Sequence, residues 1–542
     1  MEEKTYQRLS RTLLSIQNEI SSAEEEENES IPNVEAMEHN ESTEISNLKA
    51  LLQLFGPAFA TRIDFWYSVV FAILFGTLCG IVGLAFFNGF EYISANTWNT
   101  DEYQFLILKG SGCKFGTGKW ATLKIMAIGG SIIGLIKVVW ISIIGDFPEN
   151  PPSLVTEVKD LHVHDPKLSI GLLLCSIISL GIGASVGPEA AAGAIGASLG
   201  THLSSFRFIS SRMETSKSFL PFLGIAAAFG PLLPSPVLSS MLLHELTIAS
   251  ESINRFDFMH SIVLSGLAAT ISYAIFVSLE DFTFLDKKVL PVAFFQFPAA
   301  QKPDPMLILY AVPLGVISGI YGLFAIFSIG LFKGIGSALF MGCNRISKHF
   351  FGIKSQAFGL FFTPIIGACF IGVIAKYFPL SMGDGNTQLE AVIAQTFNQT
   401  LNREIKHNHT KLDDSNLLTV GDLISISLIK ILALGISLGF GFIGGQLFPL
   451  MFSGACLGAG LSLYIGNDIL PIPIAIACCL VSIPCAFTPL VFTLTCTISM
   501  MLALGSAATA PVFVSAFISY ATVCGFGIVQ RLILTGIQRK GG

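Results

Sequence analysis

The chain contains six apolar runs that are each long enough to cross a lipid bilayer, which takes about 20 helical residues. They cover residues 66–90, 120–145, 258–279, 306–334, 355–377 and 420–441. Only 13% of the side chains are charged, about half of the roughly 25% that is usual in soluble domains. The stretch between Lys430 and Arg531 contains one acidic or basic side chain, that of Asp468. The sequence therefore predicts a multi-pass integral membrane protein and excludes an ordinary soluble enzyme.

Other apolar segments are interrupted by Gly and Pro every few residues. They cover residues 168–200, 216–246, 443–465 and 469–533. Irregular backbone at membrane depth is tolerated only where protein buries it or where it lines an aqueous cavity. We therefore expect an all-α integral membrane protein with re-entrant half-helices rather than a simple bundle of spanning helices.

Two short motifs recur in the same order at the same spacing. Gly196-Ala-Ser-Leu-Gly200 returns as Gly454-Ala-Cys-Leu-Gly458, and Ala228-Phe-Gly-Pro231 returns as Ala486-Phe-Thr-Pro489. Both pairs are separated by about 258 residues. Paired halves of this kind are typical of transporter folds. The sequence predicts two inverted structural repeats, which we assign to residues 61–290 and 300–535.

The two ends of the chain and its charge narrow the range of partners. Residues 1–60 are rich in Glu, Asn and Ser and cannot bury enough apolar surface to fold, so we expect a disordered acidic cytosolic tail there and a short tail at 536–542. The net charge of −6 leaves no basic field to attract nucleic acid. The eleven cysteines lie mostly in apolar runs without metal-site spacing. The sequence predicts no metal and no cofactor.

Glu189 is the only charged side chain between Leu168 and Phe206. A buried carboxylate is costly unless it is neutralised or compensated. Pro188 suits the first turn of a helix, so Glu189 would lie where backbone N–H groups and the helix dipole favour negative charge. A place that holds a carboxylate can hold a free anion instead, which is a physical basis for a gate. A purely structural carboxylate, capping a helix or pairing with a distant lysine, remains the alternative.

The second half has a matching glycine-rich helix start, Gly444-Gly-Gln-Leu-Phe-Pro449, without an acid. Its exposed backbone amides predict a second anion-binding position, or seat, which no carboxylate of its own motif blocks. Two such starts that point inward from opposite repeats would converge near the bilayer midplane. Neutral amide dipoles bind a monovalent anion without trapping it, which a fast pore needs.

These residues resemble the CLC family of chloride channels and transporters over about residues 60–535. Gly187-Pro-Glu-Ala-Ala191 followed by Ile195-Gly-Ala-Ser-Leu-Gly200 is similar to the second anion-binding motif of the family, and Gly444–Pro449 is similar to the third. The resemblance implies the CLC fold, chloride as the bound and transported ion, and a homodimer with one pore in each subunit. It also implies Glu189 as the gating glutamate and an anion-binding set of Pro148, Gly187, Pro188, Gly445, Gln446, Leu447, Phe448 and Val529.

The chain departs from the family pattern at several positions. Ala190-Ala191 replaces a Gly-Pro pair, and the aromatic residue of the third motif falls one place late, at Phe448. The first motif is matched only by the family's spacing, about 41 residues before Glu189, which leads to Pro148; a plain loop proline is an open alternative. The C-terminal pore tyrosine becomes Val529 in the same way. Because the chain ends at Gly542, we expect no C-terminal regulatory domain.

Coupled exchangers of the family resemble one another in an inner glutamate about ten residues after a proline. With Pro231, Pro234 or Pro236 as that proline, the position falls on Met241, His244 or Leu246, and Glu245 is adjacent. We favour Leu246, which would interrupt an inner proton route.

The sequence thus predicts a passive, glutamate-gated chloride channel with dependence on voltage and pH. A proton-coupled chloride or nitrate exchanger of the same fold is the alternative, with His244 or Glu245 as the inner proton site. A membrane scaffold that conducts nothing is a third hypothesis, and it leaves the isolated Glu189 without a reason.

Overall fold

The computed structural model describes residues 62–98, 120–145, 147, 166–205, 216–247, 258–279, 305–351, 356–386, 388–389, 391–396, 418–486 and 488–525. The chain divides into two compact units, Met1–Arg62 and Ile63–Gly542. The elements below belong to the second unit, apart from the first residue of α3. The predicted tails at 1–60 and 536–542 and the predicted boundary between the repeats, at 290–300, lie outside the described residues.

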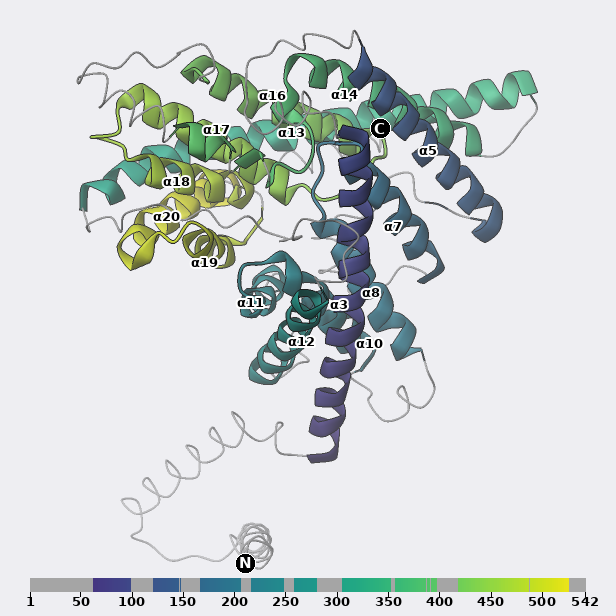
Figure 1. Ribbon diagram of the computed structural model, residues 1–542, viewed down its shortest axis with the longest axis horizontal. Coiled ribbons are helices and arrows are strands. Elements are labelled where there is room, and N and C mark those ends of the chain that lie inside the picture. Colours follow the sequence, from purple (N-terminus) through teal and green to yellow (C-terminus); the bar gives the residue numbers. More distant parts are fainter. Residues whose placement is uncertain are drawn as a thin grey trace, which may run out of the picture. The chain divides into compact units, whose positions relative to one another are not determined.

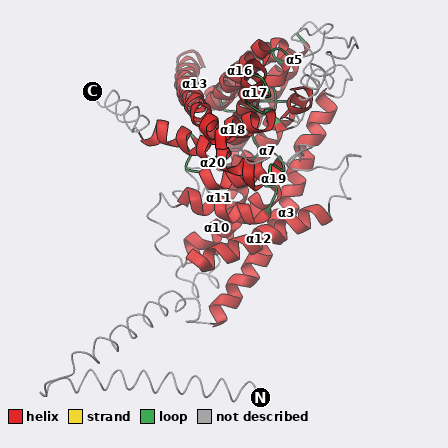
Figure 2. Ribbon diagram, turned by 90° about the vertical axis from the view of Figure 1, so that its left-hand side faces the viewer, coloured by secondary structure: helices red, strands yellow, loops and turns green. Residues whose placement is uncertain are grey.

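All regular secondary structure in the described residues is helical (Figure 2), as the predicted fold class requires. The first half has α3 (Arg62–Trp98), α5 (Ala121–Ile144), α7 (Pro166–Gly181), α8 (Glu189–Ser204), α10 (Ser216–Phe229), the short η1 (Gly230–Leu232), α11 (Pro236–Thr247) and α12 (Phe258–Ser278). The second half has α13 (Pro305–Phe351), α14 (Ala357–Tyr377), η4 (Pro379–Ser381), α16 (Val420–Gly439), α17 (Leu447–Ile465), α18 (Ile472–Cys485), α19 (Val491–Met501), α20 (Gly505–Tyr520) and the π-helical turn η6 (Ala521–Gly525). In both halves two long helices precede a series of mostly shorter ones.

Seven helices of the described residues are long and apolar enough to cross a membrane. Six of them coincide with the six predicted spans, so the prediction of a multi-pass integral membrane protein is confirmed. The seventh is Leu447–Ile465, which is continuous over 19 residues. The prediction of an interrupted segment at 443–465 was wrong from Leu447 onward. Helices α7, α8, α10, α11, α18 and α19 have 16 residues or fewer, which is too short to cross a bilayer.

The repeated glycine motifs mark two equivalent helix contacts. A Cβ atom on Gly196 of α8 would overlap the carbonyl of Gly224 on α10, and one on Gly454 of α17 would overlap the carbonyl of Cys479 on α18. Small residues allow backbones to approach this closely, which is how helices commonly associate inside membranes. The motifs therefore recur because α8–α10 and α17–α18 pack in the same way, and not because the helices break there.

We expect Gly196→Ala to lower the free energy of unfolding by about 1–3 kcal/mol, because the added methyl group overlaps backbone that cannot move aside. Thermal unfolding of the purified protein in detergent would measure the loss. Gly83→Ala on α3 is the matched control, since a Cβ there meets nothing within 4 Å. Equal stability of the two variants would contradict the close contact.

The two halves meet through α5 and α14, which lie side by side (Figure 1) and are in close contact. A Cβ on Gly130 of α5 would overlap Ala368 and the carbonyl of Pro364, both on α14. Nearer the centre, α7 ends at Gly181 and α16 ends at Gly439, and each is followed by a short loop that leads into α8 or α17. These two loops form the candidate site.

Candidate anion site

The loops that precede α8 and α17 cross each other at equivalent residues of the two repeats. Gly187 and Gly445 exchange two backbone hydrogen bonds, with N···O distances of 2.8 and 2.6 Å. They are separated by the same offset as the repeated sequence motifs. An approximate two-fold axis therefore passes between Gly187 and Gly445, and the starts of α8 and α17 lie on either side of it.

Two serines brace this crossing in the same reciprocal manner. Ser179 of α7 accepts a hydrogen bond from the N–H of Ile443 in the second loop, and Ser437 of α16 accepts one from the N–H of Ser185 in the first, both at 3.2 Å. Each hydroxyl also donates to a carbonyl of its own helix. Neither serine stands out in the sequence, because a serine in an apolar helix usually bonds only the preceding turn.

Glu189 lies at the centre of the crossing and is 1% exposed. It is the first residue of α8, as predicted, but its carboxylate points to the other half. The backbone N–H of Leu447, the first residue of α17, donates to Oε1 at 2.5 Å. The other carboxylate oxygen, Oε2, is buried and accepts no hydrogen bond from the residues that the structure describes. The anion seat at the start of α17 contains no acidic residue from the second half, but the carboxylate of Glu189 from the first half occupies it.

Gly187 and Gly445 leave the space that this carboxylate fills. A Cβ on either glycine would overlap the carboxyl group of Glu189. Any other residue at these positions would displace the carboxylate from the start of α17. The two predicted glycines therefore shape the pocket around Glu189 in addition to pairing with each other.

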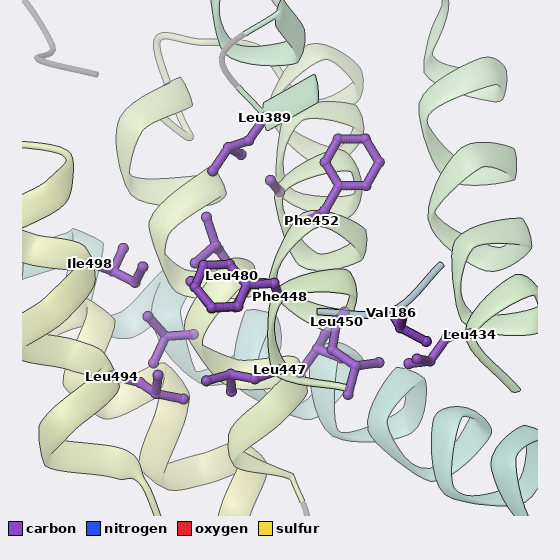
Figure 3. Close-up of a cluster of buried hydrophobic side chains, with 14 of the residues drawn as sticks. Val186, Leu389, Leu434, Leu447, Phe448, Leu450, Phe452, Leu480, Leu494 and Ile498 are labelled. Atoms are coloured by element: carbon purple, nitrogen blue, oxygen red, sulfur yellow. The ribbon is translucent and has the colours of Figure 1, made fainter. Parts of the chain in front are cut away.

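The remaining predicted anion-site residues flank the seat. Pro188 directly precedes α8, and Gln446 directly precedes α17. Leu447 and Phe448 are buried, and their side chains pack beside Leu480 of α18 and Leu494 and Ile498 of α19 (Figure 3). Side chains thus point into the hydrophobic core while the backbone amide of Leu447 faces the carboxylate. Pro148 and Val529 lie outside the described residues.

The three candidate positions for an inner proton site have different surroundings. Leu246 is fully buried in the main hydrophobic cluster. His244 lies between α11 and α12, with Nδ1 at 2.7 Å from the carbonyl of Ser240 and Nε2 at 2.7 Å from the hydroxyl of Ser261. Because a carbonyl oxygen only accepts, Nδ1 carries the hydrogen. The preferred position is therefore apolar, and the histidine beside it has both ring nitrogens engaged.

Glu245 holds the start of another helix of the second half. Its two carboxylate oxygens accept the N–H groups of Phe492 and Thr493, in the first turn of α19, at 2.8 and 2.9 Å. Negative charge is favourable at a helix N-terminus. This contact gives Glu245 a structural role in joining α11 to α19.

Two buried lysines stand near the crossing, and the sequence analysis assigned neither to the site. Lys137 of α5 donates to the carbonyl of Gly441, just after α16, at 2.6 Å. Lys430 of α16 donates to the carbonyls of Ser381, Met382 and Gly383. Lys430 lies halfway along the predicted span 420–441, where an ionisable side chain is unusual and would have been a signal. Its partners, which lie far away in the chain, are seen only in the tertiary structure.

Comparison with known proteins places this geometry in a known fold. Three solved structures resemble the chain: a CLC-type fluoride/proton antiporter (TM-score 0.56, 20% identity, 85% of this chain and 96% of the other), a slow cyanobacterial Cl⁻/H⁺ antiporter (0.61, 14%, 88% and 99%) and a eukaryotic CLC transporter (0.56, 14%, 86% and 73%). At these identities the likeness concerns the fold. A search of curated proteins finds no match.

The sequence itself also matches a family model, described as voltage gated chloride channel, over residues 134–523. The matched range contains both crossing loops, Glu189 and α17. Members of that family transport chloride and similar anions and are channels or transporters rather than enzymes. The chain therefore belongs to the voltage gated chloride channel family, with the CLC fold that its sequence predicted.

Proposed function

We propose that the chain is a passive chloride channel in which Glu189 is the gate. The proposal rests on one observation, the hydrogen bond from the N–H of Leu447 to the Glu189 carboxylate at the start of α17. A helix N-terminus attracts anions, whether a tethered carboxylate or a free ion. Chloride and the carboxylate therefore compete for the same amide, and the seat opens to chloride when the carboxylate leaves.

The unpartnered Oε2 supports a gate that moves. A buried carboxylate oxygen without a protein partner loses solvation that it would regain elsewhere, which favours departure of the side chain from this position. Protonation removes the attraction between the carboxylate and the helix dipole, and membrane voltage acts on its charge. The proposal therefore includes dependence on pH and voltage. It includes no cofactor, since chloride itself is the bound ion.

Chloride efflux from vesicles that contain the purified protein tests this function. Vesicles loaded with chloride and diluted into impermeant buffer should release it at a rate that grows with the amount of protein. Absence of any flux would favour a scaffold.

The proposal also includes a homodimer with one pore in each subunit, as the family resemblance implies, and light scattering of the detergent-solubilised protein would measure the mass of the assembly.

A proton-coupled exchanger is the second candidate. Two observations favour it: two of the similar structures are anion/proton antiporters, and Glu245 supplies a carboxylate next to the predicted inner position. Against it, Leu246 is apolar and Glu245 is engaged by two amides of α19. We favour the channel for this reason.

We expect Gly445→Ala to weaken the occlusion by Glu189. The added methyl group would overlap the carboxyl group of Glu189, and because that group ends a flexible side chain, it can move away at little cost to folding. The same methyl group takes up space that chloride needs in the seat, so chloride flux should stay below that of Glu189→Ala. Adding Gly445→Ala to Glu189→Ala should lower the flux of that variant. Equal flux of Glu189→Ala with and without Gly445→Ala would contradict a site shared by the carboxylate and chloride.

A further inference from the structure

Lys430 of α16 is fully buried, and its ammonium group contacts several backbone oxygens. Its ammonium donates to three consecutive carbonyls, those of Ser381, Met382 and Gly383, at 3.1, 3.0 and 2.7 Å. A lysine ammonium has three N–H donors, so all of them are used. The lysine thereby fixes the segment from Ser381, the last residue of η4, to Gly385, which we name the η4 turn.

The η4 turn contacts both parts of the anion site. The N–H of Gly383 donates to the carbonyl of Gly183, in the loop that leads to Glu189, at 2.9 Å. Gly385 packs against Phe452 of α17, where a Cβ would overlap the ring. The ammonium of Lys430 also lies 5.2 Å from the centre of that ring. Lys430 therefore ties the η4 turn to the helix whose start forms the seat.

The η4 turn carries a second carboxylate, Asp384. One of its oxygens accepts the N–H of Asn386 at 3.0 Å. Asp384 directly follows Gly383, whose carbonyl accepts a hydrogen bond from Lys430, so its carboxylate lies on the same short turn as the ammonium. Lys430 acts on Asp384 electrostatically, and Asp384 acts on Glu189 of α8. A negative charge close enough to repel Glu189 also repels an anion that takes the place of Glu189. The nearby positive charge of Lys430 offsets that repulsion.

We propose that Lys430, which is fully buried, and Asp384, which is half-buried in the η4 turn, together position that turn and set the electrostatic potential at the anion seat. Both are positioning residues, since neither bonds to the seat itself. The positive charge of Lys430 and the negative charge of Asp384 nearly cancel at the seat. Chloride can therefore bind there without being repelled or trapped. This inference depends on the proposed role of the Glu189 seat.

The test is the chloride concentration that gives half-maximal flux in vesicles. Lys430→Met leaves Asp384 uncompensated and should raise that concentration about tenfold. Adding Asp384→Asn to Lys430→Met removes the repulsion and should return it to within about twofold of the wild type. Asp384→Asn alone leaves the ammonium uncompensated and should lower the half-saturating concentration several-fold, which keeps the proposal testable if Lys430→Met fails to fold.

Lys137→Met is the matched control, because Lys137 is also buried and bonds a backbone carbonyl near the crossing. Asp384→Asn should not reverse its effect. If the double variant of Lys430 and Asp384 is no better than Lys430→Met, or if Asp384→Asn changes only the maximal flux, Lys430 is merely structural and the proposal is wrong. If the wild-type protein itself shows no chloride flux, the proposed transport function is wrong.

Discussion

Glu189→Ala and Glu189→Gln are expected to conduct chloride with little dependence on pH or voltage. In the wild type the carboxylate holds the amide of Leu447 that an anion needs. If it occupies the seat in about nine of ten molecules at neutral pH, its removal raises flux about tenfold. The gain should shrink as the pH falls, because protonation already weakens the hold of Glu189 on the seat in the wild type.

Efflux from vesicles between acidic and alkaline pH measures this effect, and planar bilayer recording adds the voltage dependence. Asp468→Asn is the control, since Asp468 is an exposed carboxylate in the turn between α17 and α18. It should leave the pH profile unchanged. If both Glu189 variants lose their fold, Glu189 is a structural acid that pins α8 to α17, and the gating hypothesis is wrong.

The sequence predicted the parts of this protein that depend on local pattern. Hydropathy over about 20 residues sets a membrane span, and six spans followed from it. Glu189 stood out because no other charge lies near it in the chain. The segment from Leu447 to Ile465 failed because its glycines were interpreted as breaks. In the structure Gly454 and Gly458 stay helical and let α18 approach closely.

The rest depends on contacts between the halves, which local pattern does not encode. The sequence placed Glu189 at the start of its own helix but did not predict that its carboxylate binds the start of α17, because that contact joins residues 258 positions apart. The same holds for Ser179 and Ser437, whose acceptor roles require the loops to cross. An approximate two-fold axis relates the two serine contacts to each other. The contact of Glu189 has no such counterpart, because the equivalent residue, Leu447, carries no carboxylate.

Proton movement is the second large effect, and it separates the channel from the exchanger. A coupled exchanger needs a proton route from each side to the anion site. The outer group, Glu189, is present, while the preferred inner position, Leu246, is buried among apolar side chains. Proton transfer past such a residue needs ordered water, which an apolar wall does not hold. We therefore expect chloride flux without stoichiometric proton movement.

The measurement uses a pH electrode beside vesicles driven by a chloride gradient alone, with the membrane voltage clamped by a potassium ionophore. Sustained proton uptake that Glu189→Ala abolishes would overturn the channel. His244→Leu and Glu245→Gln would then identify the inner site, because a histidine titrates near neutral pH and Glu245 is the nearest carboxylate in the chain. If only one of the two variants loses proton uptake, the residue changed in that variant is the inner proton carrier.

Both candidate inner groups, His244 and Glu245, take part in contacts that join helices. To take a proton on Nε2, His244 needs the Ser261 hydroxyl to turn from donor to acceptor, and protonation of Glu245 weakens the hydrogen bonds that it accepts from Phe492 and Thr493. Either step changes contacts that join α11 to α12 or α19. Glu189 is held by amides at the start of α17, and a chloride ion can take its place there. Chloride should therefore pass many times for each proton that does, because its arrival compensates the departure of Glu189, whereas the inner groups serve contacts between helices.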